Sequence, residues 1–114
     1  MPDEKDPLLA RLQRLSGDLP GVETGTSYGT PALKVGGKLF VRVKDAATVV
    51  LTAPVGEKER LIEIAPDIYY ETDHYRGWPA LLVRAAAIDD AELRQRLAEA
   101  WHFKAPAKLR RMRG

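Results

Sequence analysis

The chain has 114 residues, of which 45% are hydrophobic and 30% charged, as expected for one globular domain with its own core. It contains no cysteine, which excludes a disulfide framework, a thiolate metal site and a cysteine nucleophile. The first six residues are polar and acidic and every apolar run is short, so we expect no signal peptide and no membrane span, and hence a small, soluble, cytoplasmic protein.

The formal net charge of +2 is unevenly distributed along the chain. The last eleven residues carry five basic side chains and no acid, which leaves 13 basic and 16 acidic residues, a net charge of −3, in residues 1–103. A basic C-terminal arm is typical of proteins that bind polyanions, and equally of a solvated chain end. We therefore expect a single domain over residues 1–103 followed by a basic tail over residues 104–114.

The first element expected is a helix. Asp6 is a favourable N-cap and Pro7 suits the first helical position. Behind them the leucines repeat at the spacing of one helix face, at Leu8, Leu9, Leu12 and Leu15.

Between Val22 and Thr52 the hydrophobic period changes to two, which predicts an antiparallel meander. The runs span residues 22–28, 32–35, 38–44 and 48–52, and turn-forming residues separate them. For the turn at Gly36-Gly37 we predict a three-residue form with a bulge, in which Lys34 lies beside Lys38. Leu33, Leu39, Val41 and Val43 would then face the core. The side chains that would share the exposed face are Lys34, Lys38, Phe40, Arg42 and Lys44.

The second half of the chain predicts two more helices and one more strand. A short helix is expected over residues 54–65, a buried strand over 80–86, and a final helix capped by Asp89 or Asp90. The fold class is therefore α+β, with a single antiparallel sheet of about five strands and the N- and C-terminal helices packed on one face. The residues expected to be buried between helices and sheet are Leu8, Leu12, Leu15, Leu93, Leu97 and Trp101.

No set of residues predicts catalysis, and we expect no cofactor. Neither Ser16 nor Ser27 lies in a Gly-x-Ser-x-Gly motif, and the glycines do not form a phosphate-binding loop before a helix. His74 lies among acidic loop residues that could bind a metal, but no second ligand cluster completes such a site. We expect His74 to be an exposed loop residue and the chain to hold no metal.

Two surfaces remain as candidate binding sites. The basic strand face around Phe40 has cations for phosphates and a ring for bases, or it is a solvated face whose aromatic ring the following chain covers. The connection between the second helix and the last strand concentrates amphipathic rings, which either form a contact surface or cap the core. Its members are Tyr69, Tyr70, His74, Tyr75 and Trp78.

Several segments, in this order, resemble the MmcQ/YjbR family. They are PGVE (20–23), TSYGTPALKVGGKLF (26–40), DIYY (67–70), HYRGWP (74–79) and WHFKAPAK (101–108). The resemblance implies a fold related to that of frataxin and CyaY, with helices on one face of an antiparallel sheet. It also implies DNA binding through a double wing of paired hairpins, which would place residues 34–44 at the DNA.

Our leading hypothesis from the sequence is a non-enzymatic DNA-binding module. The alternative is a module that binds a small molecule or a protein through the aromatic connection, and an enzyme of unknown reaction ranks last. The residues expected to contact DNA are Lys34, Lys38, Phe40, Arg42, Lys44, Arg76, Lys104, Lys108, Arg110 and Arg111.

Overall fold

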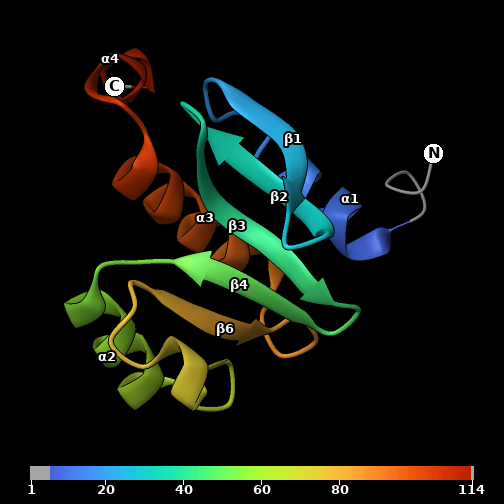
Figure 1. Ribbon diagram of the computed structural model, residues 1–114, viewed down its shortest axis with the longest axis vertical. Coiled ribbons are helices and arrows are strands. Elements are labelled where there is room, and N and C mark those ends of the chain that lie inside the picture. Colours follow the sequence, from blue (N-terminus) through green and yellow to red (C-terminus); the bar gives the residue numbers. More distant parts are fainter. Residues whose placement is uncertain (1–5, 114) are drawn as a thin grey trace.

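The computed structural model describes residues 6–113, in which three long helices and a short one accompany a six-stranded sheet (Figure 1). The strands lie in the order β1-β2-β3-β4-β6-β5, and all neighbours are antiparallel. The sixth strand is the two-residue β5, which lies inside the aromatic connection. The helices and strands are α1 (Pro7–Leu15), β1 (Val22–Ser27), β2 (Thr30–Val35), β3 (Lys38–Asp45), β4 (Thr48–Thr52), α2 (Val55–Ile64), β5 (Tyr69–Tyr70), the 3-10 helix η2 (Asp73–Tyr75), β6 (Ala80–Arg84), α3 (Asp90–Lys104) and α4 (Ala107–Arg113).

The N-terminal helix begins where the sequence predicts. The Asp6 carboxylate accepts hydrogen bonds from the backbone N–H groups of Leu8 (3.0 Å) and Leu9 (3.1 Å), which satisfies two donors of the first turn. The four predicted leucines are all buried, so the helix turns one apolar face towards the sheet.

The two helices that the sequence predicted near the chain ends, α1 and α3, pack on the same face of the sheet, as predicted. Helix α3 contacts β3 and β4, while α1 contacts β2 and α3 (Figure 1). All six residues expected in this interface are buried, and Leu97 and Trp101 are completely enclosed. The Trp101 indole N–H donates to the Pro20 carbonyl at 2.9 Å, so the buried ring keeps its hydrogen bond.

The turn between β2 and β3 differs from the prediction. Val35 pairs with Lys38, so the turn contains only Gly36 and Gly37, both at positive φ (58° and 79°), as in a type I′ hairpin. Cross-strand partners share a face, and the register therefore assigns Lys34 and Lys38 to opposite faces. The predicted bulged turn, with these two lysines side by side, is wrong.

A β-bulge further along the same hairpin reverses the predicted faces of Leu39 and Phe40. Lys34 pairs with Leu39 and Leu33 with Val41, which leaves Phe40 as the extra residue of β3. Phe40 is completely buried in the core, whereas Leu39 is half-buried on the other face. The prediction that Phe40 faces outwards with the basic residues is therefore also wrong. Strict alternation fails here because the bulge puts two successive residues on the core side.

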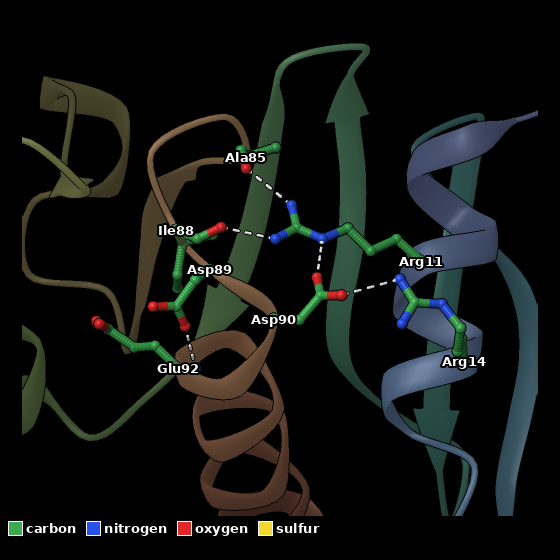
Figure 2. A network of polar contacts seen from close by, with 7 residues as sticks. All are labelled: Arg11, Arg14, Ala85, Ile88, Asp89, Asp90 and Glu92. Atoms are coloured by element: carbon green, nitrogen blue, oxygen red, sulfur yellow. Dashed lines mark hydrogen bonds and ion pairs between the residues drawn. The ribbon is translucent and has the colours of Figure 1, made fainter.

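A network of polar contacts fixes α1 against the start of α3 (Figure 2). The Arg11 guanidinium donates to the Asp90 carboxylate (2.8 Å) and to the carbonyls of Ala85 (2.8 Å) and Ile88 (2.6 Å). Arg14 donates to the other oxygen of Asp90 at 3.1 Å. These hydrogen bonds from Arg11 and Arg14 hold the pKa of Asp90 below its ordinary value.

The basic C-terminal segment is more ordered than the sequence indicates. Ala105 is buried in the core, and residues 107–113 form the short helix α4. Leu109 of α4 packs so closely on Gly21 that a Cβ there would lie 2.8 Å from its side chain, and Pro106 packs equally closely on Gly36. Deleting residues 104–114 would thus remove packing contacts as well as charge.

No helix within residues 6–113 combines the length and the apolar character needed to cross a bilayer.

Replacing Leu97 by Ala should lower the free energy of unfolding by about 2–5 kcal/mol, because a cavity would remain between α3 and the sheet. Denaturant unfolding measures this change. The control is Ile64→Ala on the exposed side of α2, which should stay within about 0.5 kcal/mol. A similar loss in both variants would contradict the packing described above.

Replacing Asp90 by Asn should lower the melting temperature at neutral pH and have little effect in acid. The pKa of Asp90 is lowered in the folded state, so its stabilising contribution is complete above the unfolded pKa of about 4 and is lost as the pH falls through the folded pKa. Thermal melts from about pH 7 down to pH 2 test this. Asp18→Asn is the control, since Asp18 is exposed and makes no ion pair within residues 6–113. A difference that persists unchanged at the lowest pH would contradict the assignment.

Candidate functional site

The face of the sheet opposite α1 and α3, here called the open face, contains a groove of about 560 Å³. The paired positions Arg42 and Val50, from β3 and β4, lie on this face. The apolar part of the groove comes from Leu39, Val50 and Ala80, which belong to three neighbouring strands. The groove is thus built on the central strands rather than on a free hairpin.

Three cationic side chains line the groove, and none of its described lining residues is acidic. Lys38 is exposed at the start of β3. Its cross-strand partner Val35 lies in the core, so the register turns Lys38 towards the side of α3, and it lines the groove from the end of the sheet. It makes no ion pair within residues 6–113. Lys104 comes from the last turn of α3, 66 positions further along the chain. Its ammonium lies 4.6 Å from the centre of the Phe103 ring. Arg42 is the third cation, and the groove is therefore electropositive.

Arg42 holds the two walls of the groove together. It is only 9% exposed and donates to Thr30 Oγ1 (3.2 Å) and to the Tyr75 hydroxyl (2.9 Å). Its guanidinium carbon also lies 5.2 Å from the centre of the Tyr28 ring, within the range of a cation–π contact. One buried cation therefore links the β1–β2 hairpin to the aromatic connection.

Tyr28 forms one wall of the groove and lies in an unfavourable backbone conformation. Ser27 pairs with Thr30, so Tyr28 and Gly29 make a two-residue turn with φ of 53° and 77°. Tyr28 is the only non-glycine residue at positive φ within residues 6–113. Its side chain is 88% exposed, so no burial in the core offsets the strain.

The opposite wall is held by a buried lysine of α2. Lys58 is 2% exposed, and its ammonium donates to the carbonyls of Tyr75 (2.7 Å) and Trp78 (2.8 Å). It also pairs with the Glu71 carboxylate at 2.6 Å. The segment from residue 71 to residue 79 is therefore fixed at three points by one charge.

The aromatic connection is divided between the core and the groove. Tyr69 is completely buried, and its hydroxyl donates to the Glu92 carboxylate. Burial and this hydrogen bond raise the pKa of Tyr69 far above its ordinary value. Tyr70 is half-buried with the Arg84 guanidinium 4.0 Å from its ring centre, outside the groove. Of the two alternatives that the sequence left open, Tyr69 belongs to the core, whereas His74, Tyr75 and Trp78 line the groove.

The predicted DNA-contacting residues are also divided. Lys38, Arg42 and Lys104 meet in the groove, while Phe40 lies in the core. Lys34 is half-buried, with its aliphatic chain close to Gly25 of the neighbouring strand. The remaining predicted contacts are exposed but lie outside the groove, and they are Lys44 beside Asp45, Arg76 paired with Asp73, and Lys108, Arg110 and Arg111 on α4.

A second hollow, of about 600 Å³, lies between α2, α3 and α4 and has a different character. Its buried Arg96 already pairs with Glu57 (3.4 Å) and Glu99 (2.5 Å). The hydrogen bond from Arg60, assisted by Arg96, keeps the pKa of Glu57 below its ordinary value. Besides Arg96, the cations Arg110 and Arg113 line this hollow, but so do the acids Glu57 and Glu99. The described lining of the groove has no acid, so the hollow is a weaker candidate for an anionic ligand than the groove.

Within residues 6–113 no group of His, Asp or Glu side chains is arranged to hold a metal ion.

Sequence reasoning missed Tyr28 and Lys58. The signal for Tyr28 was available, because Tyr28-Gly29 stands between two strand-like runs where Asn-Gly is the usual choice. The signal for Lys58 was absent, since a lysine in a charged helical stretch is usually solvated.

Comparison with known protein families identifies the family of this chain. Residues 17–103 match the sequence profile of the YjbR family. The match covers most of the chain, which therefore belongs to the YjbR family.

The curated relatives are mycobacterial proteins. Uncharacterized protein Rv2570 of Mycobacterium tuberculosis (strain ATCC 25618 / H37Rv) and uncharacterized protein Mb2600 of Mycobacterium bovis are each 43% identical to this chain over 54 residues. The aligned part is 47% of this chain and 42% of each relative, so less than half of their length is covered. No solved structure matches the chain significantly.

Replacing Lys58 by Met should release the 71–79 segment and lower the free energy of unfolding by about 1–3 kcal/mol, because two carbonyls lose their donor. Amide hydrogen exchange should accelerate in that segment more than in β3 or β4. The matched control is Glu71→Gln, which removes the ion pair but leaves both hydrogen bonds from Lys58 to the carbonyls. The control should therefore change the free energy of unfolding and the amide exchange less. Unchanged exchange in the segment would contradict the role assigned to Lys58.

Proposed function

We propose that this chain is a non-enzymatic DNA-binding module that uses the groove of the open face. The carrying observation is the composition of that groove, in which Lys38, Arg42 and Lys104 meet with no acidic side chain among the described lining residues. Cations without acidic neighbours attract phosphates and release their counterions on binding. The YjbR membership and the DNA binding that the sequence resemblance implies agree with this reading.

The proposal moves the contact surface away from the hairpin wing that the sequence suggested. Lys34 and Lys38 point to opposite faces by register, and Phe40 is buried, so the β2–β3 hairpin offers no continuous basic face. The groove instead collects its cations from β3 and from the end of α3. The exposed lysine and arginine side chains of α4 lie outside the groove, and their positive charge would attract DNA from a distance.

The side chains of the groove support a binding function better than a catalytic one. The groove offers His74 and Tyr75, but its described lining contains no serine, cysteine or carboxylate that could serve as a partner in nucleophilic or acid–base chemistry. Charge and exposed rings are suited to recognition.

A second candidate function is the binding of a small anionic molecule with an aromatic ring. It is favoured by the volume of the groove, about 560 Å³, which lies in the range of small-molecule sites. Such a ligand would use the same cations and rings and would compete with DNA.

Replacing Lys38 by Gln should weaken DNA binding and reduce the slope of log affinity against log salt by about 0.7–0.9, the contribution of one phosphate contact. A salt titration with a fluorescent oligonucleotide measures both quantities. Lys44→Gln is the matched control, because Lys44 is exposed on the same strand but lies outside the groove. Equal effects of the two substitutions would indicate general charge attraction and contradict the groove, and absence of DNA binding at low salt would overturn the proposed function.

A further inference from the structure

The strained turn at Tyr28 is the feature that the fold itself explains least. The chain has another two-residue turn of the same kind, and there both positions are glycine, Gly36 and Gly37. At Tyr28 a bulky residue adopts the left-handed conformation instead, which costs free energy. Strain of this kind persists at sites where the side chain has a function, and a side chain that is 88% exposed has little structural role to offset it.

The position of the Tyr28 ring is defined on one side only. The Arg42 guanidinium lies 5.2 Å from the ring centre, and Arg42 is itself held by Thr30 and Tyr75. The remainder of the ring faces solvent and lines the groove. Tyr28 therefore presents a ring on a rigid support, which lowers the entropy lost when a planar group stacks on it.

Trp78 supplies a second exposed ring in the same groove. Its side chain is 63% exposed, while its carbonyl is fixed by Lys58 at 2.8 Å. The Trp78 ring, like that of Tyr28, is thus exposed on an anchored backbone.

The two exposed rings suit the base of a nucleotide, and the cations Lys38 and Lys104 suit its phosphate. Aromatic side chains stack on bases of any sequence, and basic side chains along a groove contact the phosphates. In a duplex the bases are paired and stacked on one another, so their faces are not available to the protein. A single strand exposes both base faces and phosphates.

On this basis, which rests on the proposed DNA-binding function, we propose that the groove binds single-stranded DNA, with bases stacked on Tyr28 and Trp78 and phosphates on Lys38 and Lys104.

The test compares four probes at one salt concentration: a single-stranded oligothymidine, a duplex of the same length, an abasic strand with the same number of phosphates, and thymidine monophosphate. We expect the oligothymidine to bind about a hundredfold more tightly than the abasic strand, as stacking of two bases at about tenfold each predicts. We also expect it to bind more tightly than the duplex and the mononucleotide. Binding should quench the fluorescence of the exposed Trp78, and Trp78→Phe should remove this quenching because Trp101 is buried.

The variant Tyr28→Asn separates a stacking role from a structural one. Asparagine is favoured in this turn, so the melting temperature should rise by about 2–5 °C as strain is relieved. Affinity for the oligothymidine should fall about five- to tenfold, while affinity for the abasic strand should not change. A residue with only a structural role would not combine higher stability with weaker binding.

The outcomes distinguish this inference from the proposed function. If none of the DNA probes binds at low salt, the proposed function fails and the inference fails with it. If the duplex or the abasic strand binds as tightly as the oligothymidine, or if Tyr28→Asn leaves oligothymidine affinity unchanged, DNA binding stands and the stacking inference is overturned. Equal affinity for thymidine monophosphate would overturn it in favour of a free nucleotide as the ligand.

Discussion

The groove depends on one buried charge, the ammonium group of Lys58. An ammonium has three N–H donors, and here it meets two backbone carbonyls and one carboxylate, so its burial is compensated. Both carbonyls belong to the segment that carries Tyr75 and Trp78, while Lys58 belongs to a helix that packs against β5 and β6. The lysine thus holds the segment from residue 71 to residue 79, in which one short 3-10 helix is the only regular element, against the rigid helix and sheet.

Arg42 shows that basic residues in this protein have two different roles. Its guanidinium is largely committed to Thr30, Tyr75 and the Tyr28 ring, and it positions groups more than it attracts anions. Lys38 and Lys104 are more accessible and line the same groove. A count of basic residues along β3 therefore overestimates the phosphate contacts, because the side chain in the middle of the strand is buried.

At position 28, the residue that would make the turn most stable is not the residue that the proposed binding uses. The β1–β2 turn would be relaxed with asparagine or glycine at position 28, yet it carries a tyrosine at positive φ. The cost is small for a domain whose buried core includes eight hydrophobic residues of α1 and α3 and in which every residue of β4 is buried. A fold of this size can hold a strained residue when the surrounding hydrogen bonds determine the turn.

The sequence by itself determined the three longer helices, five of the six strands and most of the core, but neither α4 nor β5. Capping residues and the leucine spacing define α1 and α3, and alternation defines the strands, because each of these signals is local. The register of the β2–β3 hairpin and the bulge at Phe40 were not determined, since a shift of one residue exchanges the two faces with little change in local pattern. Only the tertiary structure placed Tyr28, Lys38, Trp78 and Lys104 around one groove. These residues are far apart in the chain, and they meet because the order of the strands and the hydrogen bonds of Arg42 and Lys58 bring their backbones together.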